Sequence, residues 1–127
     1  VITNPEVSAV RDADRIIGII EAEEKGPARL LINRLNPKMV AENNMISADD
    51  IVDLLAVEVV GIIPEDKNVL ISTNTGMPIA LDGNSLAGEA FRNLALRVQG
   101  EPVPFLDLSK RTGILSKISS VFGSGDK

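Results

Sequence analysis

The spacing of apolar positions changes several times along the chain. Between residues 4 and 24 the apolar side chains recur every three or four positions, which predicts an amphipathic helix. Asn4 suits the N-cap of this helix and Pro5 its first turn. The residues expected on its buried face are Val7, Val10, Ile16, Ile17 and Ile20.

Two largely apolar runs, 28–35 and 57–63, have the length of buried strands, and the second is rich in β-branched residues. Asn36-Pro37 after the first run predicts a turn. Further helices are expected at 47–55, 66–74 and 85–99, each opened by a Ser or Asp that suits an N-cap.

Strands and helices therefore alternate, and such alternation predicts an α/β fold with a parallel sheet. Residues 1–3 resemble the end of a strand, with no turn or cap before them. Three strands, one of them a stub, make a poor open sheet. These observations favour the hypothesis that the chain is the C-terminal part of a longer α/β protein.

Composition removes several classes of chemistry. The chain has 127 residues, 44% of them hydrophobic, and contains neither cysteine nor histidine. Disulfides and thiolate metal sites are therefore excluded, as are Ser-His triads and most zinc sites. The sequence also lacks the patterns G-x-x-x-x-G-K-[ST] and G-x-G-x-x-G that cradle phosphates.

The last eighteen residues differ in character from the rest. We expect a globular part at 1–100, a linker with two prolines at 101–109 and an amphipathic helical tail at 110–127. A basic amphipathic helix outside a domain suits the surface of an anionic membrane. The residues expected to bind it are Lys110, Arg111, Ile114, Leu115, Lys117, Ile118, Val121 and Phe122.

Charge is divided in the same way. Residues 1–109 hold nine Lys/Arg and seventeen Asp/Glu, a net charge of −8, whereas residues 110–127 hold four and one, a net charge of +3. The acidic part disfavours binding to nucleic acid and leaves the tail as the contact with lipid. A three-turn anchor binds weakly alone, and two anchors on one dimer act together. The alternative is a tail that docks on its own domain or on a partner protein.

Polar residues at the ends of the two long strands are candidates for a ligand site. Asn33-Arg34 ends the first strand, and Pro64-Glu65-Asp66 follows the second. Ligands of open α/β sheets bind outside the carboxyl ends of the strands, and these groups suit the edge of a purine. The structural alternatives are a turn-stabilising role for Asn33 and an N-cap role for Asp66.

Four segments carry a resemblance to a known family. Residues 1–15, 33–37, 61–66 and 74–79 resemble, in order and spacing, the deviant Walker ATPases of the MinD/ParA family. The terminal helix is similar to the membrane-targeting helix that occurs in part of this family. The resemblance covers essentially the whole chain, and it implies the C-terminal part of a Rossmann-like, three-layer P-loop NTPase fold.

The resemblance also implies a cofactor, ATP, and a site for it. Asn33, Arg34, Pro64, Glu65 and Asp66 match the rim of the family's adenine pocket, with Asn33, Pro64 and Asp66 favoured for direct contacts to the base. The family's phosphate-binding loop, signature lysine, Mg²⁺ ligands and switch regions all precede the matched part. We therefore do not expect this chain alone to hydrolyse ATP.

Partners are implied in the same way. Ser8, Arg11, Asp12 and Asp14 match the face that receives a MinC-like division inhibitor and a MinE-like activator; the structural alternative is an exposed helix face with an Asp12–Arg15 ion pair. The expected function is ATP-dependent homodimerisation, membrane binding and placement of the division septum. The expected location is the cytoplasmic face of a bacterial inner membrane, cyanobacteria included, and the alternative is a plastid stroma. The rival hypothesis is a partitioning ATPase or cargo scaffold whose tail binds protein.

Overall fold

Three parallel strands form the centre of the molecule. The structure is a computed structural model that describes residues 1–109, so the predicted tail and its membrane-binding residues lie outside the described residues. The sheet has the order β1 (Ile2–Thr3), β2 (Arg29–Leu35), β3 (Glu58–Pro64), and both neighbouring pairs are parallel. The parallel α/β fold predicted from the alternation of elements is confirmed.

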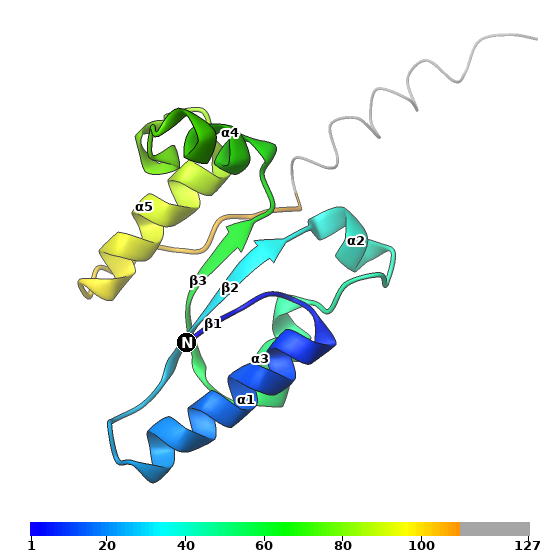
Figure 1. Ribbon diagram of the computed structural model, residues 1–127, viewed down its shortest axis with the longest axis vertical. Coiled ribbons are helices and arrows are strands. Elements are labelled where there is room, and N and C mark those ends of the chain that lie inside the picture. Colours follow the sequence, from blue (N-terminus) through cyan, green and yellow to red (C-terminus); the bar gives the residue numbers. More distant parts are fainter. Residues whose placement is uncertain (110–127) are drawn as a thin grey trace, which may run out of the picture.

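Helices cover both faces of this sheet. α1 (Val7–Ala22) and α3 (Ala48–Leu55) lie on one face, and α4 (Lys67–Thr75) and α5 (Leu86–Val98) lie on the other (Figure 1). The side chains of the first face form one core cluster with the sheet, and those of α5 form a second. Leu30, Ile32, Ile51 and Ile63 are the largest fully buried side chains. The molecule is a three-layer sandwich, and β2 is its buried centre.

Three of the four expected N-caps form, whereas the prediction for Asn4 is wrong: α1 follows Glu6, and no side chain caps it. Ser47 accepts a hydrogen bond from the amide of Asp50 at 3.1 Å, and Asp66 and Ser85 cap α4 and α5 in the same manner. Gly76 ends α4 in the left-handed conformation, with φ of 71°, which glycine adopts without strain. Local sequence signals therefore fix the starts of three helices and the end of one.

Two short elements were not predicted. Asn36-Pro37, expected as a turn, opens α2 (Pro37–Ala41), where the Asn36 side chain accepts hydrogen bonds from the amides of Lys38 and Met39. A 3₁₀ turn, η1 (Ile79–Leu81), lies against α5. A side chain at Gly88 of α5 would meet the carbonyl oxygen of Ile79, so glycine permits this close approach.

The first helix differs from its prediction at both ends and on its face. It begins at Val7 rather than at Pro5, because Glu6 still has extended backbone with φ of −128°, and it ends at Ala22 rather than near Glu24. Its buried residues are Val10, Ala13 and Ile17, whereas Val7 is 63% and Ile16 49% exposed. The prediction that Val7 and Ile16 are buried is wrong: β1 is an edge strand, and Ile16 lies in a shallow hollow beside it.

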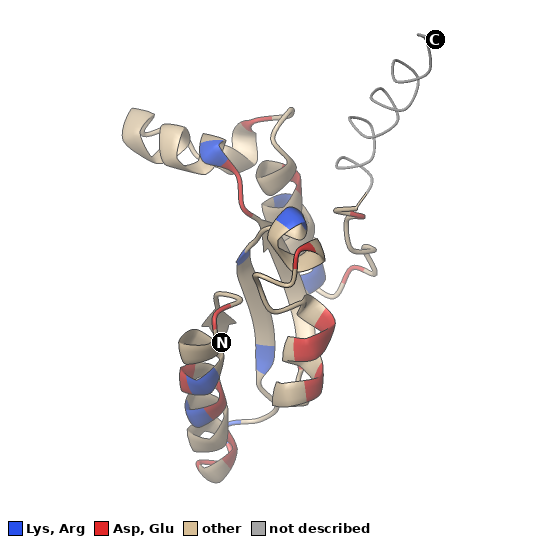
Figure 2. Ribbon diagram, turned by 90° about the vertical axis from the view of Figure 1, so that its right-hand side faces the viewer, with Lys and Arg blue, Asp and Glu red and all other residues tan. Residues whose placement is uncertain are grey.

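Residues 101–109 form no helix or strand, yet they pack on the domain. Arg97, near the end of α5, donates hydrogen bonds to the carbonyls of Val103 and Pro104, both at 2.7 Å, and to that of Val60 in β3 at 3.3 Å. Leu106 packs against the α5 cluster and Leu108 against the α1/α3 cluster. The segment runs along the outer side of β3 toward the carboxyl ends of the strands (Figures 1 and 2). In the described part of the chain, none of the helices is both long enough and apolar enough to cross a bilayer.

Candidate functional site

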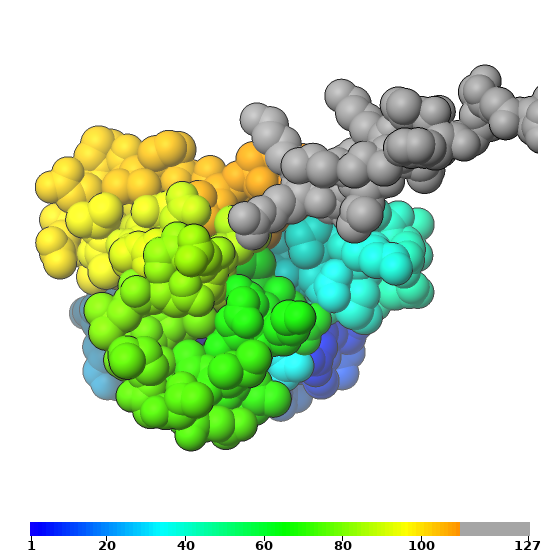
Figure 3. Space-filling model, turned by 90° about the horizontal axis from the view of Figure 1, so that it is seen from above, coloured from blue at the N-terminus to red at the C-terminus, as the bar shows by residue number. Residues whose placement is uncertain are grey.

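A cavity of about 610 Å³ opens at the carboxyl ends of β2 and β3. Figure 3 looks onto this end of the molecule, where α4 is green and the α2 region is cyan; Lys67, Val69, Leu70 and Thr73 of α4 line the cavity. All five residues predicted for the adenine rim line this one cavity; they are Asn33, Arg34, Pro64, Glu65 and Asp66. The rest of the lining includes apolar side chains, those of Ile63, Val69, Leu70 and Phe91. A mostly apolar hollow with a few convergent polar groups is the usual form of a small-molecule site.

A bulge in β2 shapes the first part of the rim. The register between β2 and β3 shifts between Ile32 and Leu35, and Arg34 between them has φ of 57°. This left-handed conformation is uncommon for a residue with a side chain, and it costs about 1–3 kcal/mol. The bulge interrupts the alternation of side chains along the strand. Asn33 and Arg34, although adjacent, consequently both line the cavity.

Glu65 holds the two strand ends together. Its carboxylate accepts hydrogen bonds from Asn36 at 3.1 Å and from Arg34 at 3.2 Å, and its amide donates to the carbonyl of Leu35 at 2.8 Å. The hydrogen bonds from Asn36 and Arg34 lower the pKa of the Glu65 carboxyl below its ordinary value, more than its slight burial raises it. Glu65 is therefore fixed as an anion that braces the β2 bulge.

Asp66 caps α4 and connects it to the N-cap residue of α5. One oxygen accepts from the amide of Asn68 in α4 at 2.9 Å, and the other accepts from the hydroxyl of Ser85 at 2.8 Å. The amide of Ala87 in α5 also favours the charged form of this carboxylate. Burial raises the pKa of the Asp66 carboxyl, but these donors together outweigh it, so the pKa lies below its ordinary value. The N-cap role considered for Asp66 is confirmed, and the carboxylate still lines the cavity.

Asn33 contrasts with these two acids. Its half-buried side chain lines the cavity and makes no hydrogen bond to any other residue of the described part of the chain. The turn-stabilising role considered for it is therefore not seen. An amide offers both donors and an acceptor, which matches the mixed donor and acceptor edge of a purine. Pro64, the buried last residue of β3, lines the same cavity as Asn33.

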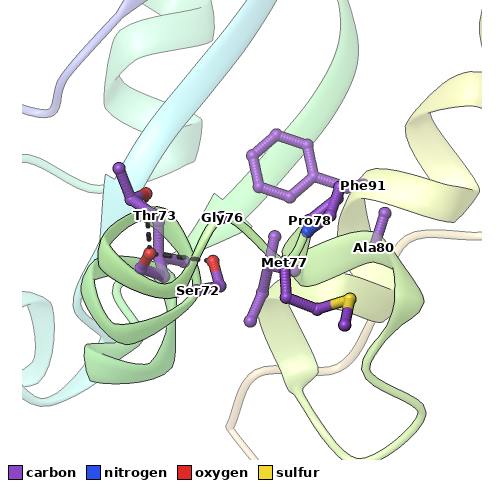
Figure 4. Close-up of a pocket in the computed structure, with 9 residues that line it drawn as sticks. Ser72, Thr73, Gly76, Met77, Pro78, Ala80 and Phe91 are labelled. Atoms are coloured by element: carbon purple, nitrogen blue, oxygen red, sulfur yellow. Dashed lines mark hydrogen bonds between the residues drawn. The ribbon is translucent and has the colours of Figure 1, made fainter.

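A second hollow, of about 480 Å³, lies between α4 and α5 (Figure 4). Met77, Pro78, Ala80 and Phe91 give it an apolar lining. Its hydroxyl groups, on Ser72 and Thr73, both donate to the carbonyl of Val69 in the preceding turn, at 2.9 Å. It therefore lacks the free polar groups that would read the edge of a base, and the strand-end cavity is the better candidate site.

The residues predicted to meet protein partners lie elsewhere, on α1. Ser8, Arg11, Asp12 and Asp14 are all exposed, and this helix carries charged residues of both signs (Figure 2). Asp12 and Arg15 approach to 3.5 Å, which confirms the expected ion pair. Arg11 and Asp14 form no ion pair with other residues of the described part. This surface is separate from the strand-end cavity.

Two residues that shape the site were missed by sequence reasoning. Asn36 donates to Glu65, and Ser85 donates to Asp66 from nineteen positions away. The Asn-Pro pair that opens α2 was a usable signal for Asn36, because Asn and Pro suit the N-cap and N1 positions. For the Ser85–Asp66 pair no local signal exists. Among residues 1–109, no group of three His, Cys, Asp or Glu side chains is placed to hold a metal ion.

Comparison with known proteins places this geometry in context. No protein-family model matches the chain. The septum site-determining protein MinD of Synechocystis is 49% identical over 120 residues, which are 93% of this chain and 45% of that protein. The MinC:MinD cell division protein complex of Aquifex aeolicus contains a chain that is 42% identical, with a TM-score of 0.80 over 84% of this chain and 44% of that one.

A third match comes from an archaeon. The septum site-determining protein MinD of Pyrococcus horikoshii, complexed with Mg-ADP, is 27% identical, with a TM-score of 0.62 over 76% of this chain and 40% of that one. The chain thus spans about half the length of the relatives it matches, in their C-terminal half. In sequence and in fold, the chain belongs to the MinD family of septum site-determining proteins.

Proposed function

We propose that this chain supplies the adenine-binding and partner-binding half of a peripheral membrane ATPase that places the division septum. The observation that carries the proposal is the convergence of Asn33, Arg34, Pro64, Glu65 and Asp66 on one cavity at the carboxyl ends of two parallel strands. Ligands of open α/β sheets bind at this end. The P. horikoshii relative complexed with Mg-ADP supports a nucleotide as the ligand.

In this proposal each half of the ATPase has its own task. Asn33 and Asp66 contact the adenine base, and Pro64 packs beside it. Glu65 and Arg34 hold the β2 bulge that presents Asn33. The phosphate-binding loop and the Mg²⁺ ligands belong to the N-terminal half that the longer relatives contain, so this chain alone binds the base without hydrolysing ATP.

Partner binding is assigned to the exposed polar face of α1. The Aquifex relative occurs in a MinC:MinD complex, which supports a MinC-like division inhibitor as one partner. Asp12 and Asp14 would pair with basic groups of the incoming protein, and Arg11 with an acidic one. A MinE-like activator that stimulates hydrolysis is the second proposed partner, on the same face.

The last step of the proposal is membrane binding by the tail, and it is argued from the tail's sequence. ATP joins two protomers, and two basic amphipathic tails on one dimer bind an anionic membrane where one alone is too weak. Hydrolysis separates the protomers and releases them. The tail residues in this proposal are Lys110, Arg111, Ile114, Leu115, Lys117, Ile118, Val121 and Phe122.

Vesicle sedimentation tests the proposal. Full-length protein should pellet with anionic vesicles in ATP and stay in the supernatant in ADP. Ile118→Glu should abolish pelleting and leave ATP affinity unchanged, whereas Ser120→Glu, the same charge on the polar side of the tail, should reduce pelleting only slightly. Equal pelleting in both nucleotides would reject the coupling. Salt-sensitive retention on DNA without pelleting would instead favour the partitioning ATPase.

A further inference from the structure

Ser85 connects the candidate nucleotide site to the start of α5. Its side chain is only 3% exposed, and its hydroxyl is used twice. It accepts a hydrogen bond from the amide of Gly88 at 3.0 Å, which caps α5, and it donates to a carboxylate oxygen of Asp66 at 2.8 Å. Ser85 does not line the strand-end cavity, so it can act on a ligand there only through Asp66.

The Asp66 carboxylate has little freedom left. One oxygen accepts from the amide of Asn68 and the other from the Ser85 hydroxyl, while the amide of Ala87 also favours the charged form. A carboxylate offers about four acceptor positions, so acceptor capacity remains toward the cavity. The amides are fixed by the helices, whereas the Ser85 hydroxyl is a donor that a single substitution removes.

A carboxylate held in this way can distinguish two purines. Adenine carries an amino donor at the position where guanine carries a carbonyl acceptor. A fixed, ionised acceptor binds the first group and repels the second. A carboxylate that can turn away from the base, or pick up a proton and donate, loses this discrimination.

We propose that Ser85 is a positioning residue that orients Asp66 and thereby sets the preference of the site for adenine over guanine nucleotides. This inference rests on the proposed nucleotide-binding function. Loss of the Ser85 donor frees one side of the carboxylate, while the helix that supplies the amides remains. The effect should therefore appear in the ratio of the affinities for ATP and GTP, more than in either affinity alone.

The test measures Kd for ATP and for GTP with full-length wild type and four variants. Ser85→Ala should lower the ATP:GTP affinity ratio about 3- to 10-fold, the range expected for one hydrogen bond. Ser85→Gly also removes the donor but remains a tolerated N-cap, so it should lower the ratio equally with less loss of thermal stability. Ser85→Thr keeps the hydroxyl and should restore the ratio.

Ser47→Ala is the matched control, because Ser47 caps α3 in the same way and its hydroxyl donates to Asp50, outside the cavity. It should lower the melting temperature without changing the ratio. An unchanged ratio in both Ser85→Ala and Ser85→Gly would overturn the inference while leaving the proposed function intact. A wild type that binds neither nucleotide, or binds both equally, would overturn the proposed function and the inference with it.

Discussion

The strand-end cavity and the polar face of α1 are built on opposite principles. At the cavity, Glu65 and Asp66 are fixed by hydrogen bonds from distant parts of the chain, and Arg34 is held in a left-handed conformation. On α1, Ser8, Arg11 and Asp14 extend from a regular helix into solvent, and Asp12 forms only a long ion pair with a neighbour on the same helix.

This difference shows how the two surfaces can be told apart by experiment. A side chain that fixes other parts of the structure contributes to stability as well as to binding, so its loss should change both. A side chain displayed on a helix contributes to binding alone. Substitutions in the two regions should therefore divide into those that lower the free energy of unfolding and those that do not.

The largest effect on stability is expected for Asp66→Ala. This change removes the N-cap of α4 and leaves the buried Ser85 hydroxyl without its acceptor. The cap and the hydrogen bond are each worth about 1 kcal/mol, so the free energy of unfolding should fall by about 2 kcal/mol. Urea unfolding of full-length protein measures the loss. Asp49→Ala, an exposed acid in the first turn of α3, is the control and should cost much less. Equal losses would mean that the α4 cap and the bond to Ser85 contribute nothing.

A smaller, pH-dependent effect is expected for Glu65→Gln. Because the pKa of Glu65 is lowered in the folded protein, its contribution is complete above its ordinary pKa of 4.5 and is lost as the pH falls through the lower folded value. Both charged partners are substantially exposed, so the difference at pH 7 should be under about 1 kcal/mol. Unfolding of wild type and variant should converge as the pH falls below 4.5. A difference that grows with acidification would contradict the assignment.

The smallest effect on stability is expected on α1. Asp12→Ala removes only an exposed ion pair, so the free energy of unfolding should change by less than about 0.5 kcal/mol. Its binding to a MinC-like partner should nevertheless weaken, which titration calorimetry can measure. Glu21→Ala, near the other end of the helix, is the matched control and should bind normally. Normal binding by Asp12→Ala would remove this residue from the proposed surface.

Much of the fold could be predicted because its signals are local. Long apolar runs gave β2 and β3, and Ser47, Asp66 and Ser85 marked helix starts because each N-cap bond spans only two or three residues. The five rim residues were found together because the carboxyl ends of parallel strands meet at one edge. The resemblance to the MinD/ParA family indicated the same positions independently.

The features that the sequence did not predict correctly depend on tertiary contacts. Val7 and Ile16 follow the apolar period of α1, but their exposure is decided by the open edge at β1, which no residue within the helix encodes. The left-handed Arg34 follows from the shift in register between two strands, and arginine itself gives no sign of it. The contact from Ser85 to Asp66 joins two caps that were each predicted, although their meeting was not.

The two edges of the described sheet differ in how far other parts of the chain cover them. Along β3, residues 101–109 with their two prolines lie against the strand, and the Arg97 guanidinium donates a hydrogen bond to the carbonyl of Val60. No incoming chain can add its main chain there without first displacing that covering. Among residues 1–109, no strand pairs with the outer side of β1, and Ile2 is 68% exposed. A strand that enlarges this sheet therefore meets less cover on the β1 side, beside α1.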